Sequence, residues 1–193
     1  MSPVDPVESL RSTYTSLLHA ALDALSEEPL GEAVALLEAA RREGRLVIVF
    51  GNGGSAATAA HMACDLGKNV PPVDGRAIRI VALADATPTL TAYANDMAYD
   101  QTFAQPLLTL GSPGDVAIAI SGSGESPNVT AAVEAAKARG MSVLALAGPG
   151  DSTLAGLADV CIRSTGRSPE QIEDVHLVVN HLLTVALRES AAR

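Results

Sequence analysis

Short apolar runs recur along the middle of the chain, and each is followed by a loop and a stretch with helical periodicity. The runs begin at Arg45, Ile78, Val116 and Val143, and a weaker one begins at Asp159. Strands that are apolar throughout are typical of a sheet buried on both faces, hence a parallel sheet. The helical stretches lie near residues 55–66, 87–93, 127–139, 152–157 and 169–188. We therefore predict an α/β fold, a doubly wound parallel sheet of five strands in a flavodoxin-like αβα sandwich.

Two more amphipathic stretches precede the first strand, at residues 7–25 and 30–42. In the first, apolar residues such as Leu10, Tyr14 and Leu17 recur at the helical period. We expect N-terminal helices at about 7–43, added to an α/β core at about 45–190. The length of 193 residues suits a single domain, residues 1–193.

The formal net charge of -9 gives no support to binding of nucleic acid or of anionic membranes, because both need clustered Lys and Arg. No apolar run reaches the ~20 residues that cross a bilayer. The start of the chain lacks the basic and apolar regions of a signal peptide. Cys64 and Cys161 lie in apolar surroundings without metal-type spacing, so we expect reduced core thiols in a cytoplasmic protein.

A glycine-rich loop follows the first strand and leads into a helix: Gly51, Asn52, Gly53, Gly54 and Ser55. Glycines let the backbone approach a ligand, and a helix amino terminus offers unpaired N–H groups to an anion. The alternative is a tight turn with Ser55 as the helix cap. Three glycines and an asparagine exceed what a cap needs, which favours a ligand loop.

A serine-rich loop follows the third strand and also enters a helix. Its hydroxyls at Ser121, Ser123 and Ser126 can surround a phosphate with neutral donors. The alternative is a flexible polar loop. The position at the carboxyl end of a parallel strand favours a binding site.

Histidines and carboxylates recur at helical spacing on two of the predicted helices. His61 and Asp65 are four residues apart and share one face, where they can bind zinc, shuttle protons or simply form a surface hydrogen bond. Glu173 and His181 are about 80° apart around the last helix and ~12 Å apart along it. One metal would therefore need both side chains to lean together, or ligands from neighbouring subunits. His176, rotated by about 140° from His181, is expected to pack or hydrogen-bond instead, as is His19.

With these motifs in place, the chain resembles the sugar isomerase (SIS) domain family over about residues 10–190. The likeness rests on the glycine and serine loops, on residues 92–96 and on residues 173–176 with His181. Within the superfamily the chain is most similar to the phosphoheptose isomerases. The resemblance implies that Ser121, Ser123 and Ser126 hold phosphate. It also implies contacts to the sugar, which fall on Asn52, Gly53, Ser55 and Asp96.

The resemblance further implies a zinc site and no nucleotide cofactor. Its ligands would be His61, Asp65, Glu173 and His181, with Asp65, Glu173 and His181 also catalytic. Two of these depart from the family, which has Glu at position 65 and Gln at position 173. The family's arginine after this helix is also replaced, by Lys68 and Asn69. A misplacement of ~1 Å can cost about 10²-fold in rate, so these changes bear directly on the chemistry.

The leading hypothesis is an aldose–ketose isomerase that converts sedoheptulose 7-phosphate to D-glycero-D-manno-heptose 7-phosphate through an enediol. The phosphosugar is the expected partner, in a homotetramer with sites at subunit interfaces. One alternative is an isomerase of a different phosphosugar. Others are a non-catalytic SIS protein that binds the bacterial replication initiator, and a sugar-phosphate sensor.

Overall fold

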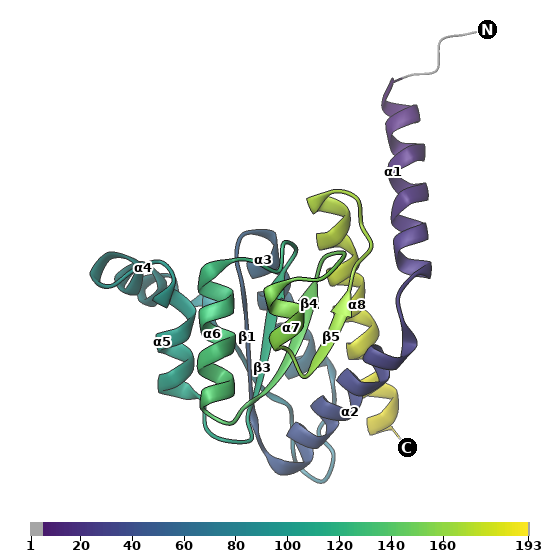
Figure 1. The fold of residues 1–193 in the computed structure, drawn as a ribbon. Helices are drawn as coiled ribbons and strands as arrows, with labels where there is room; N and C mark the ends of the chain where they lie inside the picture. Colours follow the sequence, from purple (N-terminus) through teal and green to yellow (C-terminus); the bar gives the residue numbers. More distant parts are fainter. Residues whose placement is uncertain (1–5, 193) are drawn as a thin grey trace, which may run out of the picture.

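The computed structural model describes residues 6–192, built around one five-stranded sheet with helices on both faces (Figure 1). All neighbouring strands are parallel, in the order β2-β1-β3-β4-β5, which confirms the predicted doubly wound fold. The strands are β1 (Leu46–Gly51), β2 (Arg79–Ala82), β3 (Val116–Ser121), β4 (Ser142–Ala147) and β5 (Val160–Arg163). Residues 1–5 and residue 193 lie outside the described residues. The expectation that the start of the chain is not a signal peptide falls partly on residues 1–5.

Two apolar layers bury the sheet, because successive side chains of a strand point to opposite faces. Val47 and Val49 of β1 pack into one layer, and Ile48 and Phe50 pack into the other. The first layer is covered by α2 (Glu27–Glu43), α3 (Gly54–Cys64) and α8 (Pro169–Ala191). The second is covered by α5 (Gln101–Leu110), α6 (Pro127–Ala138) and α7 (Thr153–Leu157).

The first helix, α1 (Pro6–Asp23), extends away from the sheet (Figure 1) and contacts the first turns of α8. The Tyr14 hydroxyl donates a 2.6 Å hydrogen bond to Asp174 Oδ2 of α8. Leu10 on the same helix is 67% exposed. The predicted pair of N-terminal helices is therefore present, with α1 attached mainly by its second half.

The structure adds elements that the sequence pattern did not predict. Helix α5 follows α4 (Thr87–Asp96). Phe103 and Leu107 are buried on one face of α5, but Pro106 lies inside the helix, where a proline is not expected. Immediately after α3 the chain widens into a short π-helix, η1 (Asp65–Asn69). Strand β2 gives way to a 3₁₀ turn, η2 (Leu83–Asp85).

The expectation that Cys64 is a core thiol is wrong, because Cys64 is exposed. The buried face of α3 carries Ser55, Ala59 and Met62, and Cys64 lies two residues past Met62, about 200° around the helix. Cys161 is half-buried, and both thiols are free. Among residues 6–192, no helix combines the length and the apolar character that a membrane span requires.

Candidate active site

The glycine loop after β1 is tied to the other loops at the carboxyl edge of the sheet. Gly53 has a φ of 55°, which favours glycine, and α3 begins at the next residue. Asn52 and Asn128 exchange side-chain hydrogen bonds of 2.8 and 2.9 Å, and the Tyr99 hydroxyl donates to Asn52 Oδ1 at 3.0 Å. The alternative of Ser55 as the helix cap is wrong: Ser55 is buried inside the first turn of α3.

The serine loop after β3 gathers its three hydroxyls around one point. Ser121 Oγ lies 3.2 Å from Ser126 Oγ and 3.4 Å from Ser123 Oγ. Ser126 occupies the N-cap position of α6, yet its hydroxyl makes no capping hydrogen bond. The backbone N–H of Gly124 donates to Ser121 Oγ at 3.2 Å. Hydroxyl hydrogens rotate freely, so this cluster can turn its O–H groups toward an anion.

A pocket of about 450 Å³ lies between these loops and the start of α8. Its walls include Asn52, Ser55, the three serines and Glu173. The amino termini of α3, α6 and α8 all border it, and helix amino termini favour anions. Arg167, just before α8, adds a cation that the sequence analysis missed. The pocket thus supplies neutral donors, helix termini and one positive charge to a phosphate group.

Glu173 brings a carboxylate into the same pocket from the first turns of α8. The side chain lies directly over Gly54, where a β-carbon would overlap its carboxylate. Among residues 6–192 the Glu173 carboxylate has no hydrogen-bond partner. An unpaired carboxylate beside the serine loop is placed to exchange protons with a molecule bound in this pocket.

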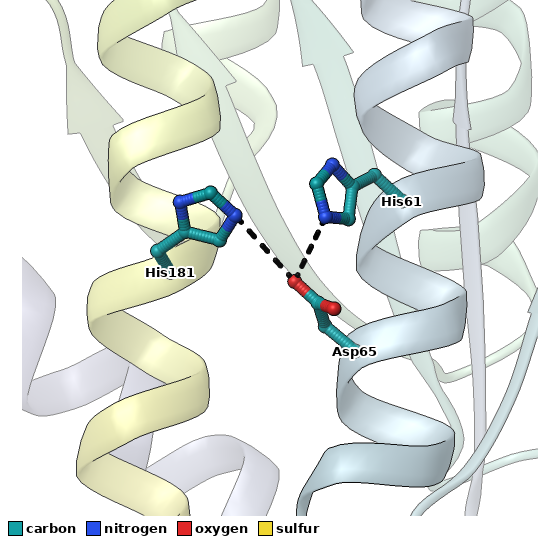
Figure 2. Close-up of side chains that lie close together, drawn as sticks. All are labelled: His61, Asp65 and His181. Atoms are coloured by element: carbon teal, nitrogen blue, oxygen red, sulfur yellow. Dashed lines mark ion pairs between the residues drawn. The ribbon is translucent and has the colours of Figure 1, made fainter.

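His61, Asp65 and His181 form a second cluster, where α3 and α8 run side by side (Figure 2). Asp65 Oδ2 lies 3.3 Å from His61 Nε2 and 3.7 Å from His181 Nε2. Asp65 is 7% exposed, whereas both imidazoles are about half exposed. One potential ligand atom from each residue lies within 4.8 Å of the others.

The donor set of this cluster fits a zinc ion. Tetrahedral zinc with ligands at ~2.0–2.2 Å places neighbouring ligand atoms about 3.3 Å apart, close to the 3.3 and 3.7 Å that separate Asp65 Oδ2 from the two imidazole nitrogens. Two imidazole nitrogens and one carboxylate oxygen are ligands of catalytic zinc, which keeps one position open. Glu173 is not among the residues that the structure gathers here. Its assignment as a ligand stays a prediction.

The remaining predicted residues are placed elsewhere. Asp96 is exposed at the end of α4, accepts a hydrogen bond from Asn95, and lines a separate hollow with Tyr93 and Met97. Gly53 is exposed at the start of α3. His19 pairs with Asp23 on the surface of α1, as expected for a hydrogen-bonding residue.

His176 confirms its predicted packing role. Its side chain is 1% exposed, and Nε2 lies 3.1 Å from the Ala147 carbonyl oxygen at the end of β4. Burial lowers the pKa of His176, and the hydrogen bond to Ala147 offsets part of that effect. The imidazole is therefore held neutral.

Tyr14 shows the opposite shift on the outer side of α8. Its hydrogen bond to Asp174 raises the pKa of Tyr14 to about 12, with burial and nearby acidic groups acting in the same direction. This contact links α1 to the residue next to Glu173. Nothing in the spacing of the sequence signalled it.

Comparison with known proteins gives a consistent family assignment. The family model described as the SIS domain matches residues 12–148. A phosphoheptose isomerase of Rhodospirillum rubrum is 41% identical over 158 residues, which cover 80% of this chain and 81% of that protein. A phosphoheptose isomerase of a Shewanella species is 36% identical over 182 residues, or 92% of each chain.

The solved structures agree with the sequence relatives. The structure of a phosphoheptose isomerase from Neisseria gonorrhoeae matches with a TM-score of 0.85 and 30% sequence identity. The match covers 95% of this chain and 97% of that chain. The whole described fold, including the helices that precede the sheet, is therefore similar to that structure.

Proposed function

Because the chain belongs to the SIS-domain family, and within it to the phosphoheptose isomerases, we propose that it is an aldose–ketose isomerase of sedoheptulose 7-phosphate. The observation that carries this is the single pocket in which Ser121, Ser123 and Ser126 face Glu173. The serine hydroxyls, the helix termini and Arg167 hold the phosphate. Asn52 and Ser55 contact the sugar. Gly53 is a further proposed sugar contact. Asp96 lines a separate hollow in this chain and stays a proposed sugar contact on the family resemblance alone.

Glu173 is the proposed base. Its carboxylate lines the pocket and has no hydrogen-bond partner among residues 6–192, whereas the amide groups of Asn69 and Asn180 already occupy both oxygens of Asp65. Glu173 takes the proton from C1 of the ketose, and His181 gives a proton to O2, which yields the enediol. The Glu173 carboxylic acid returns its proton to C2, and His181 takes the proton from O1, which leaves the aldehyde and restores both residues. Glu173 and His181 stand ~12 Å apart along α8, so the reacting carbons would have to lie between the two side chains.

We place a zinc ion between His61, Asp65 and His181, with Glu173 as the fourth candidate ligand from the family pattern. When bound, such an ion polarises substrate oxygens and stabilises negative charge on the enediolate. The exposed imidazoles orient their Nε2 atoms toward Asp65, and the buried carboxylate fixes their spacing.

We propose that residues 1–193 act as one SIS domain in a cytoplasmic homotetramer whose active sites lie at subunit interfaces. Leu182 and Val185, beside His181 on α8, are 45% and 39% exposed, and no residue of α4 is buried within the chain. A neighbouring subunit would cover these apolar surfaces.

The test is turnover of purified protein with sedoheptulose 7-phosphate, followed by NMR for the aldose product, with and without added zinc. Pentose, hexose and octose phosphates serve as comparison substrates. Preferential conversion of the heptose supports the proposal. Conversion of another phosphosugar alone reassigns the substrate, and phosphosugar binding without any conversion contradicts the enzyme. The relatives compared above are named phosphoheptose isomerases, which favours the enzyme over the replication-initiator partner and the sensor.

A further inference from the structure

A row of polar residues runs through the buried face of α8. His176, Asn180 and Thr184 follow one another at four-residue steps and are all buried, beside an apolar row that includes Val179 and Leu183. Asn180 is 0% exposed, and its Oδ1 atom has no hydrogen-bond partner among residues 6–192. A buried amide with an unpaired oxygen costs folding free energy compared with an apolar side chain. The oxygen end of Asn180 therefore gives no reason for an asparagine here, and the reason must lie with its nitrogen.

The other end of this amide holds the candidate metal ligand. Asn180 Nδ2 donates to Asp65 Oδ2 at 3.0 Å, and Asn69 Nδ2 donates to Asp65 Oδ1 at 3.0 Å. Both carboxylate oxygens are thus fixed by amides, one from α8 and one from the end of η1. The reverse orientation of Asn180 would set its oxygen against the carboxylate, so electrostatics favours the orientation found.

The contact compensates for a departure from the family pattern. The family resemblance implies glutamate at position 65, and Asp65 is one methylene shorter. Asn180 is the chain neighbour of His181, so its hydrogen bond draws the shorter carboxylate toward the helix that carries the second imidazole. We propose that Asn180 is a positioning residue, which holds Asp65 at the distance from His181 that a shared metal ion requires. This inference rests on the proposed metal site but not on the identity of the sugar.

Asn180→Leu is the direct test, read out as the affinity for Zn²⁺ in competition with a chromophoric chelator, without substrate. Loss of an outer-shell partner typically costs 10–100-fold in metal affinity, and we expect a loss in that range. The visible absorption spectrum of the Co²⁺-loaded protein should change as well, because the carboxylate shifts. A purely structural role would lower the melting temperature in chelator without altering the spectrum of the loaded protein. Asn180→Ala gives a second variant in case leucine does not fold.

Two further variants separate the role of Asn180 from a general effect of changing the buried face of α8. Thr184→Val removes the next polar group of the same buried row, which does not contact Asp65, and should leave Zn²⁺ affinity unchanged. In an Asp65→Glu background the longer side chain reaches the metal without the hydrogen bond from Asn180. Adding Asn180→Leu there should therefore reduce the Zn²⁺ affinity less than threefold.

Each outcome has a defined meaning. Wild-type affinity and spectrum in both Asn180 variants would overturn the role of Asn180 while leaving the proposed function intact. An equal loss in the wild-type and Asp65→Glu backgrounds would overturn the compensation. Failure of the wild-type protein to bind Zn²⁺ or Co²⁺ would overturn the metal site and this inference together. Metal binding that depends on Asn180, without turnover of the heptose phosphate, would support the inference and contradict the substrate.

Discussion

The imidazole rings of His61 and His181 meet edge to face, with their centroids 5.1 Å apart. His61 lies on α3, which follows the first strand, and His181 lies on α8, the last helix of the chain. Both Nε2 atoms face the same oxygen of Asp65 (Figure 2). Helices α3 and α8 both begin at the phosphate pocket and continue past it side by side. The pocket and the His–Asp–His cluster therefore lie along one pair of helices.

Glu173→Gln introduces the residue that the family resemblance implies at this position and removes the proposed base. We expect kcat to fall by about 10²-fold or more, because an amide cannot accept the substrate proton. KM should change little, since the phosphate contacts remain. Steady-state kinetics checks this. Full activity in the glutamine variant would assign the proton transfer to Asp65 instead.

Gly54→Ala tests the position of the Glu173 side chain without altering it chemically. The new methyl group would overlap the carboxylate, so Glu173 must rotate away and kcat should fall about tenfold or more. Gly31→Ala, in α2 and with open space around it, is the matched control. That control should keep its activity and gain about 0.5–1 kcal/mol in unfolding free energy. Equal activity of the two variants would mean that the observed Glu173 position is not needed.

Ser123→Ala tests the phosphate loop at its most exposed hydroxyl. Removing one donor should raise KM for the phosphosugar several-fold and leave kcat nearly unchanged, because the phosphate is bound alike in ground state and transition state. Ser190→Ala, on the exposed end of α8, is the control. A fall in kcat at unchanged KM would place Ser123 in the chemistry rather than in phosphate binding.

His176 predicts a specific dependence of stability on pH. Its pKa is lowered in the folded state, so below about pH 6.5 the unfolded chain binds a proton that the folded protein resists. Unfolding free energy should therefore fall as the pH drops below about 6.5, by at most about 1.4 kcal/mol per pH unit for this group, and level off below the folded-state pKa. Denaturant melts of wild type and His176→Leu in chelator measure it. Parallel pH profiles would contradict a buried neutral imidazole.

The fold was largely predictable because apolar strands and intervening helices repeat with little ambiguity. Val47 to Phe50 and Val116 to Ile120 are apolar at every position, which only a doubly covered strand explains. Helix α5 was missed because Pro106 lies within it. Cys64 was misplaced because apolar neighbours along the chain do not define which side of a helix is buried.

The site was predictable where its residues are close in sequence. Spacing alone puts His61 and Asp65 on one face of a helix, and the serine loop is recognisable from its composition. The approach of His181 to Asp65 depends on how α8 is aligned against α3, which no local pattern encodes. Asn180 and Arg167 gave no signal for the same reason: each gains its role from a residue far away in the chain.

The most direct test of the whole account is proton exchange during turnover in D₂O. Purified wild-type protein and His181→Ala are incubated with sedoheptulose 7-phosphate, and NMR follows aldose formation together with deuterium incorporation at C2 of the aldose and at C1 of the recovered ketose. The account predicts both in the wild type and a loss of about 10²-fold or more in the alanine variant, with the phosphosugar still bound. Undiminished exchange and turnover without His181 would contradict it.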